Sequence, residues 1–432
     1  NENINEEWIS DKTRYSCDGL LKQRLDTPYI RENGRLQKSS WKDASSFLIK
    51  NLKNFNPNEM AGLVGDLADL EMIYSFKSFF EKNLGSNNLE CRSKRIYINP
   101  KERINYIFNS KINGLEESDF ILLVGTNPRL EATMLNARIR KAYKKNNTKI
   151  YSIGNPGNLT YPYEDTGSST AIIKDIISGS HTLSDKIKKS KKPIVIIGES
   201  ALSSNCGQYI FETLKHFLFN NNFINNNWNA LNILSQDASR VGAIDLDFHS
   251  ITEKENFGFF DKLDNDEFKF LYLLGADNIN FEKKDKFIVY QGSHGDKGAE
   301  MADVILPGAA YTEKNGLFVN LEGKVQDAFK ASYPPGEARE DWIIFKNLAK
   351  MMNKSLEFKD SQHLRNLIKK HIQLKIGNNI ITKDNINFIE EEISIKPIDY
   401  YYTNAVARSS KVMSECRQVS KNFSFSEIEK AS

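Results

Sequence analysis

The sequence predicts an α/β fold with mostly parallel sheets, and three observations support this. Short, strongly apolar runs are typical of strands that are buried on both faces. Longer segments with a helical spacing of apolar residues separate these runs. Several runs end in glycine followed by a small or polar residue, which is typical of a strand-to-helix turn. The predicted strands are 120–124, 150–153, 193–197, 231–234, 268–274 and 287–290.

Helices are predicted between the strands and after them. Ser40 is placed to cap a first helix, and cations gather near the C-terminal end of a second. The region 331–432 begins with a Pro-Pro-Gly break and is poor in apolar runs, so we expect a helical and extended tail that wraps the body or contacts a partner. The predicted helices are 41–52, 130–144, 342–353 and 363–374.

Length and composition exclude several classes of protein. With 432 residues and 40% hydrophobic content, the chain is long enough for two or three domains with real cores. Fifty-nine basic against 56 acidic residues give a net charge of +3, which is no electrostatic argument for a nucleic-acid partner or an anionic membrane surface. No window approaches the length of apolar sequence that a bilayer requires, so we expect no membrane span.

Cysteine and histidine are too scattered for a disulfide scaffold or a metal centre. No two cysteines lie within four residues of each other, which excludes CxxC and ferredoxin-type cluster motifs. The six histidines occur singly. The cysteines are Cys17, Cys91, Cys206 and Cys416.

The turn formed by Gly125, Thr126 and Asn127 is the clearest strand-to-helix connection. It places backbone N–H groups and a helix N-terminus at the carboxyl edge of the predicted sheet, which is a natural phosphate site. Because neither a GxGxxG nor a P-loop motif is present, an ordinary tight connection is the alternative interpretation.

The densest group of unusual residues runs from 292 to 326, directly after a predicted strand, where ligands bind in open α/β sheets. Its glycines indicate backbone that passes close to a ligand or to other backbone. The alternative is that Asp303 and Glu313 are local caps and that His294 is a hydrogen-bonded loop residue. The side chains that offer acids, bases and charge are His294, Asp296, Lys297, Glu300, Asp303, Glu313 and Lys314.

Arg129, Arg138, Arg140 and Lys141 place cations on one predicted helix. We interpret them as a solvated helix face rather than an anion-binding patch. Aromatic residues do not alternate with basic ones, which argues against a nucleic-acid stacking surface.

Several motifs resemble the molybdopterin oxidoreductase superfamily: MADVILPG at 301–308, YTEKNG at 311–316, VNLEGKVQ at 319–326, and VGTNPR at 124–129. Other motifs resemble one branch of it, the largest peripheral-arm subunit of respiratory complex I (NADH:ubiquinone oxidoreductase). These are WISDKTR at 8–14, GDLAD at 65–69, NARIRKA at 136–142, SHGD at 293–296 and DYYYT at 399–403.

The resemblance implies a formate-dehydrogenase-like architecture of two interleaved, doubly wound lobes with mostly parallel sheets, plus a helical and irregular C-terminal extension. It maps residues 1–34 as a linker that contacts an iron–sulfur module, 35–90 with 235–330 as a discontinuous α/β lobe, 91–234 as an inserted α/β lobe, and 331–432 as the tail.

In the catalytic relatives, the cleft holds a molybdenum or tungsten ion on pterin dithiolenes, whereas the complex I branch keeps the cleft loops without that cofactor. The resemblance therefore implies no catalytic, cofactor-binding or metal-binding residue in this chain. FMN and iron–sulfur clusters are expected on partner chains. The degenerate cleft loops, retained for packing, are those around Gly125, Thr126, Asn127, His294, Asp303 and Glu313.

By the same resemblance, the chain is a non-catalytic scaffold in the peripheral arm of mitochondrial complex I, on the matrix side of the inner membrane. The alternative is the catalytic large chain of a molybdenum or tungsten oxidoreductase of the formate or nitrate type. Because the sequence starts at Asn1 rather than Met and holds no cluster-ligating motif, we expect the iron–sulfur module on another polypeptide or on a longer form of this one.

Residues 1–40 are expected to face that module, because they carry apolar side chains in a segment too short for its own core. Other peripheral-arm subunits are further expected partners. The apolar residues are Trp8, Ile9, Tyr15, Leu20, Leu21, Leu25 and Ile30.

Overall fold

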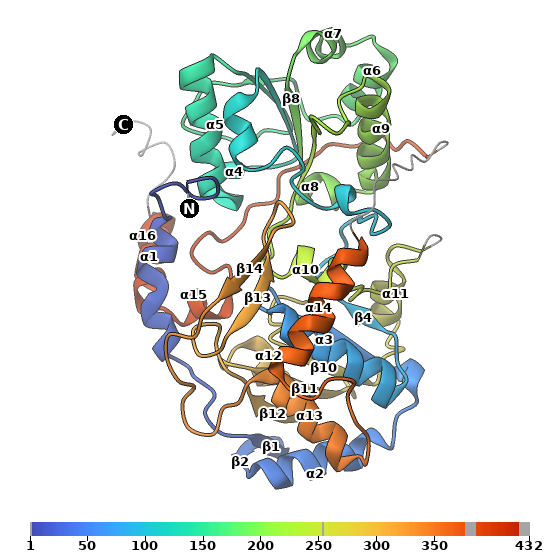
Figure 1. Ribbon diagram of the computed structural model, residues 1–432, viewed down its shortest axis with the longest axis vertical. Coiled ribbons are helices and arrows are strands. Elements are labelled where there is room, and N and C mark those ends of the chain that lie inside the picture. Colours follow the sequence, from blue (N-terminus) through green and yellow to red (C-terminus); the bar gives the residue numbers. More distant parts are fainter. Residues whose placement is uncertain (1, 253–254, 376–385, 423–432) are drawn as a thin grey trace.

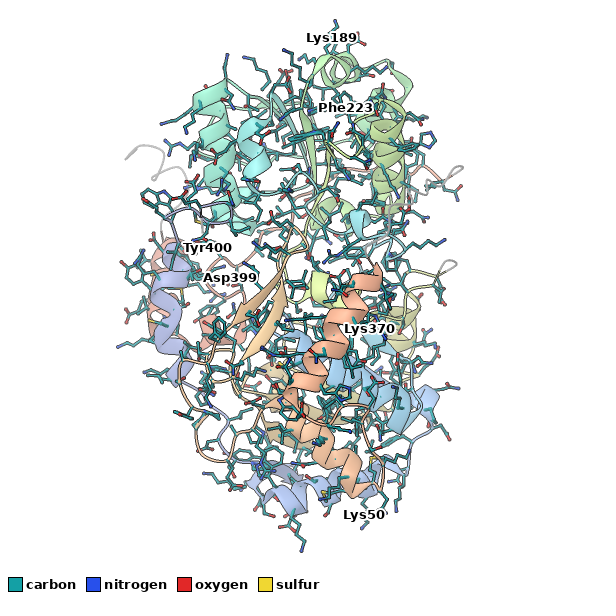
Figure 2. The ribbon with its side chains drawn as sticks, in the orientation of Figure 1. Lys50, Lys189, Phe223, Lys370, Asp399 and Tyr400 are labelled. Atoms are coloured by element: carbon teal, nitrogen blue, oxygen red, sulfur yellow. The ribbon has the colours of Figure 1, made fainter. Side chains whose placement is uncertain are left out.

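The structure is a computed structural model that describes residues 2–252, 255–375 and 386–422. Two α/β lobes are stacked along the long axis of the molecule, with the hairpin β13 (Gly316–Val319) and β14 (Val325–Ala328) reaching from one to the other (Figure 1). Figure 2 marks the two far ends, with Lys189 on the upper lobe and Lys50 on the lower lobe.

The upper lobe is built on a five-stranded sheet in which all strands are parallel, in the order β7-β6-β5-β8-β9. Its central strands are completely buried because helices cover both faces, which agrees with their continuous apolar sequences. The strands are β5 (Phe120–Val124), β6 (Lys149–Ile153), β7 (Glu164–Asp165), β8 (Pro193–Gly198) and β9 (Leu231–Leu234). The helices are α4 (Pro128–Glu131), α5 (Thr133–Asn146), α6 (Ala171–Ser178), α7 (Thr182–Lys189), α8 (Glu199–Leu202) and α9 (Gly207–Asn220).

The lower lobe is built on a seven-stranded sheet in the order β2-β1-β12-β11-β10-β3-β4. The five strands from β12 to β4 are parallel, whereas β1 pairs antiparallel with both β12 and β2 at one edge. The strands are β1 (Tyr29–Glu32), β2 (Arg35–Lys38), β3 (Met60–Val64), β4 (Leu89–Glu90), β10 (Phe270–Leu274), β11 (Phe287–Gly292) and β12 (Val304–Pro307).

Helices flank this sheet, and the chain then returns along the molecule. Ser40 caps the first of them, because its side chain accepts a hydrogen bond from the Asp43 N–H. The helices are α2 (Trp41–Leu52), α3 (Leu70–Ser78), α10 (Arg240–Asp245), α11 (Gly258–Asp264), α12 (Lys297–Met301), α13 (Asp341–Met351) and α14 (Ser361–Lys375). The N-terminal helix α1 (Asp11–Tyr15) lies beside the C-terminal helices α15 (Ala405–Ser409) and α16 (Lys411–Asn422).

Aromatic side chains form the centre of the lower core. The Phe76 ring of α3 lies 4.8 Å from Phe80, 5.0 Å from Tyr272 of β10 and 5.3 Å from Phe345 of α13, measured between ring centroids. Aromatic pairs of this kind stabilise the fold by more than the burial of their apolar area alone. They fasten two helices to the middle of the sheet, and so they fix the loops that leave its carboxyl edge.

The α/β class with mostly parallel sheets is confirmed, and each predicted strand is present. The helix predicted at 130–144 is instead two helices, because the backbone at Ala132 is extended (φ −150°) between α4 and α5. All five strands of the upper sheet lie within 91–234, although the exact boundaries of that lobe stay a prediction.

Five strands of the lower sheet, β1, β2, β3, β4 and β12, are not among the strands that the sequence predicts. Strand β3 contains Met, Ala and Gly, which are weak strand formers. Strand β1 lies within residues 1–34, which the resemblance maps as a linker, and it pairs with β12 of the lower sheet. Ile30 and Leu25 are both buried in the lower lobe, in different hydrophobic clusters, which corrects their expected place on a partner-facing surface.

We predict that Gly62→Ala destabilises the lower lobe, because a Cβ on Gly62 would lie 2.8 Å from the Phe76 Cζ and 3.0 Å from the Leu89 Cδ2. Overpacking of this kind costs about 1–3 kcal/mol. The matched control is Gly114→Ala, whose Cβ would meet nothing closer than 3.7 Å. Thermal unfolding of the purified chain should show a lower midpoint for the first variant alone, and equal midpoints would contradict this packing.

Candidate functional site

The carboxyl edges of the two parallel sheets face each other across a cleft. Loops after β3 and β10 enter it from the lower lobe, and loops after β5, β8 and β9 enter it from the upper lobe. A cavity of about 340 Å³ lies between them. Its lining includes Lys12, Asp66, Lys94, Glu131, Glu199, Asp237, Asn278, Asp399 and Tyr402.

The cleft is acidic. Five of these lining side chains are carboxylates and two are lysines. Burial raises the pKa of Asp66 to about 7, and the neighbouring Asp237 carboxylate adds to the shift. Burial also raises the pKa values of Asp237 and Glu131. Burial in the cleft therefore disfavours the charged forms of these three carboxyl groups.

The predicted phosphate turn is occupied by a carboxylate of the same chain. Gly125 has a φ of +57°, which glycine adopts without strain. Thr126 donates its hydroxyl to Glu131 Oε2 at 2.6 Å, and the Asn127 N–H donates to Glu131 Oε1 at 3.0 Å. The donors that would bind a phosphate are therefore satisfied internally.

Residues 389–409, which we call the C-terminal strap, run across this edge. Ile393 is 1% exposed, and its Cγ2 lies 2.9 Å from the position that a Cβ on Gly125 would take. Its N–H donates to the Ser168 carbonyl at 2.7 Å. The strap thus fills the position directly above the upper sheet where a ligand of an open α/β sheet would lie.

Further hydrogen bonds fasten the strap along its length. The Cys206 N–H donates to Glu391 Oε1 at 2.6 Å, and the Thr170 N–H donates to the Glu391 carbonyl at 2.9 Å. The Lys396 N–H donates to Ser200 Oγ at 3.0 Å. Backbone groups at the edge are therefore paired with the strap, as buried polar groups require.

The same strap closes the carboxyl edge of the lower sheet. Ala405 and Val406 of α15 line a cavity of about 50 Å³ together with Asp277 and His294. Asp277 accepts hydrogen bonds from the Tyr290 hydroxyl at 2.9 Å and from the Gly298 N–H at 3.0 Å. Burial raises the pKa of Asp277 to about 6, with a contribution from Asp296. The strand β10 also ends in glycine, Gly275, but no helix forms between it and β11, a stretch that the structure describes throughout.

His294, predicted at this edge, is buried and hydrogen-bonded. Its Nε2–H donates to the Gly19 carbonyl at 2.9 Å, and its Nδ1 accepts from the Ser293 hydroxyl at 2.8 Å. Burial lowers the pKa of the imidazole. These contacts agree with the interpretation of His294 as a loop residue that holds the N-terminal segment.

Asp303 and Glu313 likewise have internal partners. Asp303 lies at the amino end of β12, where it accepts the Ile288 N–H at 2.8 Å and Lys283 Nζ at 2.6 Å. It is therefore at the opposite edge of the sheet from His294. Glu313 binds the Arg24 guanidinium through both carboxylate oxygens, at 2.5 and 2.6 Å. Asp303 is thus separate from the other predicted site residues, whereas His294 and Lys314 line one cavity and Arg24 joins the loop of His294 to Glu313.

The other charged residues of this cluster have separate roles. Asp296 caps α12 and pairs with Arg408 at 2.5 Å. Lys314 is buried between Asp69 at 2.8 Å and Asp341 at 2.6 Å. Lys297 and Glu300 are exposed on α12.

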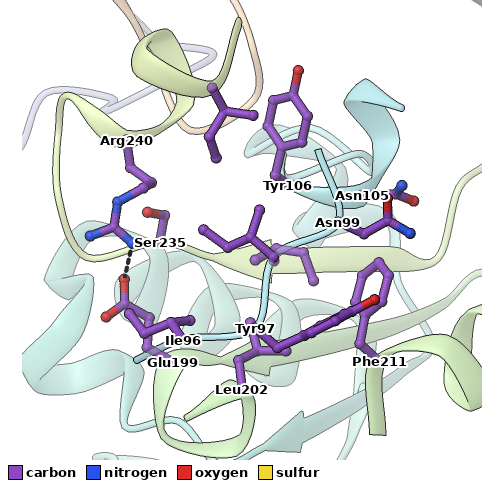
Figure 3. Close-up of a pocket in the computed structure, with 13 residues that line it drawn as sticks. Ile96, Tyr97, Asn99, Asn105, Tyr106, Glu199, Leu202, Phe211, Ser235 and Arg240 are labelled. Carbon is purple, nitrogen blue, oxygen red and sulfur yellow. Dashed lines mark ion pairs between the residues drawn. The ribbon is translucent and has the colours of Figure 1, made fainter. Parts of the chain in front are cut away.

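The sequence analysis missed the carboxylates of the cleft as a group. Asp66, Glu199 and Asp237 each follow a buried strand by one to three residues, and this position was the available signal. Figure 3 shows the ion pair between Glu199 and Arg240, whose charged atoms are 3.7 Å apart. Both residues line a cavity of about 20 Å³. Within residues 2–252, 255–375 and 386–422, no group of three or more His, Cys, Asp or Glu side chains is arranged to hold a metal ion.

Comparison with known proteins places the chain in a family. Residues 24–351 match the molybdopterin oxidoreductase family, and residues 1–18 match the 4Fe-4S domain of the NADH-ubiquinone oxidoreductase NDSU1/NuoG-like family. Two solved structures share the fold at 13% identity and a TM-score of 0.50. They are acetylene hydratase from Pelobacter acetylenicus, covering 78% of this chain and 63% of that one, and a chain of the formyltransferase/hydrolase complex from Methylorubrum extorquens, covering 76% and 99%.

Other relatives are more similar to this chain in sequence than these two structures are. The chain is 42% identical to the NADH-ubiquinone oxidoreductase 75 kDa subunit of Reclinomonas americana, over 98% of this chain and 64% of that protein. It is 40% identical to the mitochondrial NADH-ubiquinone oxidoreductase 78 kDa subunit of Candida albicans, over 96% and 59%. It thus spans about three fifths of these relatives. The chain belongs to the molybdopterin oxidoreductase family, and the relatives that it matches are the 75 kDa and 78 kDa subunits of NADH–ubiquinone oxidoreductases.

Proposed function

We propose that the chain is a non-catalytic structural part of the peripheral arm of mitochondrial complex I, where it supports electron transfer from NADH to ubiquinone. One observation carries this proposal: the chain's own C-terminal strap covers the carboxyl edges of both sheets and its carboxylates bind donors of their turns, although a cavity of about 340 Å³ stays between the lobes. The relatives are subunits of NADH–ubiquinone oxidoreductases, which supports the assignment to such an assembly.

The cofactor of catalytic molybdopterin oxidoreductases does not fit this cleft. Its pterin nucleotides carry phosphates, whereas the cleft presents Asp66, Glu131, Glu199, Asp237 and Asp399. The Thr126 and Asn127 donors are bound to Glu131, and Lys94 pairs with Glu199 at 3.0 Å, so these groups are not free to bind a phosphate. The proposal therefore assigns no cofactor to this chain and places FMN and the iron–sulfur clusters on partner chains. The alternative, a formate- or nitrate-type catalytic chain, gains no support from this site.

The proposed contact with the iron–sulfur module uses an apolar face formed by three segments. Leu21 is 84% exposed, Phe329 is 78% exposed and Tyr333 is 83% exposed. The backbone N–H groups of residues 331 and 332 donate to the Thr312 carbonyl. The Arg24 guanidinium donates to the Leu20 carbonyl and also binds Glu313, so these segments lie near one another. We call this surface the apolar face. It comprises Leu21, Tyr311, Phe329 and Tyr333, together with three exposed residues of the adjoining N-terminal segment, Trp8, Ile9 and Tyr15.

Exposed aromatic groups of this kind typically mark protein interfaces. Residues 1–18 match an iron–sulfur domain family, which supports that domain as the occupant of the adjoining surface. The proposed location is the matrix side of the inner membrane. In the described residues, no helix has the length and apolarity needed to cross a bilayer.

We predict that His294→Ala and Asp303→Ala reduce the amount of assembled complex without changing turnover per complex. Each removes a partner of a buried polar group, which costs about 1–3 kcal/mol. The measurement is NADH–quinone activity normalised to complex content on a native gel, with Lys297→Ala as the exposed control. Normal content with activity reduced about 100-fold would indicate acid–base chemistry and would refute the scaffold proposal.

We also predict that Phe329→Ser combined with Tyr333→Ser weakens retention of the iron–sulfur module about tenfold or more, because buried aromatic anchors dominate interface energies. The thermal midpoint of the chain alone should not change, since both side chains are exposed. Leu374→Ser, at an 81% exposed position on α14, is the control. Unchanged retention of the module by the double variant would remove the apolar face from the interface.

A further inference from the structure

A set of cations without carboxylate partners lies at the end of the upper lobe that points away from the lower lobe (Figure 1, near α7). All of these side chains are exposed, and among the described residues none forms an ion pair with a carboxylate. We call this surface the cationic end. It comprises Arg140, Lys144, Lys145, Lys149, Lys188, Lys189 and Lys191.

The topology gathers these residues from distant parts of the sequence. Phe120 of β5 pairs with Lys149 at the start of β6 and with Pro193 at the start of β8. The C-terminal ends of α5 and α7 lie directly before those strands in the sequence. The amino edge of the upper sheet therefore collects cations from two helices, the start of β6 and the loop before β8.

Nearby carboxylates do not neutralise this surface, because most of them already have partners. Glu116 pairs with Arg138 and Lys141, and Glu117 pairs with Lys192. Arg138 is therefore buried and not on the solvated helix face predicted for it, whereas Lys141 is half-buried and ion-paired. The Asp119 carboxylate accepts hydrogen bonds from Ser190 and from the N–H groups of residues 191 and 192. Asp185, exposed on α7, offsets one charge at most.

Helix dipoles explain only part of the set. Lysines in the last turn of a helix are stabilised by the C-terminal carbonyls, which accounts for Lys144 and Lys145 on α5 and for Lys188 and Lys189 on α7. Arg140 lies earlier in α5, and Lys149 and Lys191 lie outside the helices. The helix dipoles therefore do not account for Arg140, Lys149 and Lys191.

The charge of the whole chain is also unevenly distributed. Residues 91–234 contain 20 basic and 11 acidic residues, a net charge of +9. The remaining sequence has 39 basic and 45 acidic residues, so the net charge of +3 conceals an excess of −6 outside the upper lobe. Such asymmetry orients a protein during association.

We propose that the cationic end is a docking surface for an acidic segment of another polypeptide in the same assembly. The inference rests on the proposed function only for the identity of that assembly. Six of its seven cations are lysines, whose compact charges suit many exposed contacts with Asp and Glu side chains.

The surface is less suited to other anionic partners. Phe219, on α9, is the single exposed large hydrophobic residue in 91–234, all of which the structure describes, so the lobe offers little to insert into a membrane. The Phe217 ring beneath Lys188 is buried, so it is not available to stack on a single-stranded nucleic acid.

The first test uses the purified native complex and a carbodiimide, which joins a lysine amine to a carboxylate in contact with it. We expect mass spectrometry to find links from Lys144, Lys145, Lys188, Lys189 or Lys191 to Asp or Glu of another polypeptide. Links from these lysines only to carboxylates of the same chain would overturn the proposal. Absence of any co-purifying subunit would contradict the proposed function instead. The second test would then still show whether the cationic end binds an acidic segment.

The second test measures binding of the purified chain to a poly-glutamate peptide at low salt. Reversal of Lys144, Lys145, Lys188 and Lys189 to Glu should weaken binding at least about tenfold, as loss of several exposed ion pairs implies, and added salt should weaken it in the parent chain. The control reverses Lys42, Lys50, Lys53 and Lys350, which are exposed on the lower lobe, with the same change in net charge.

The outcomes separate the possible partners. Equal loss of binding in both variants would show a net-charge effect and overturn the proposal. Charge-dependent binding to phosphatidylserine vesicles without binding to poly-glutamate would assign the surface to a membrane, which also overturns it. If the reversed variant unfolds, replacement of the same four lysines by Gln tests the same prediction.

Discussion

The carboxyl edges of two facing parallel sheets impose the main constraint on this molecule. Such edges expose backbone N–H groups and helix N-termini, which bind an anionic ligand in many α/β proteins. Here the chain supplies the partners itself. Glu131 accepts from the turn at Asn127, Glu391 accepts from Cys206, and Ile393 packs over Gly125. The cleft is thereby a structural junction between the lobes.

Buried charges fix the loops that form this junction. Burial opposes the charge on Lys314, but the carboxylates of Asp341 and Asp69 outweigh it and raise its pKa. The three side chains tie the start of the hairpin to α3 and α13. At the C-terminal end of the strap, Arg408 forms an ion pair with Asp296, so the strap is held by charge as well as by packing. Removing one partner of such a pair costs far more than an exposed ion pair contributes.

The sequence predicts the strands where apolar runs are continuous, as in β5 and β8, because burial on both faces requires that pattern. It misses β3, whose Gly62 is dictated by the Phe76 ring across the core, a contact that no local pattern records. The group at 292–326 is recognisable from its composition, yet Asp303 and His294 lie at opposite edges of one sheet. The strap has no periodicity to predict its path, because its contacts are with residues far away in sequence.

The central claim is that the chain itself fills the place of the pterin cofactor. It is tested most directly by elemental analysis of the purified native complex for molybdenum and tungsten, together with fluorescence of oxidised pterin extracts. The account predicts neither metal above background and no pterin. A stoichiometric amount of either metal with pterin, recovered on this chain, would contradict it.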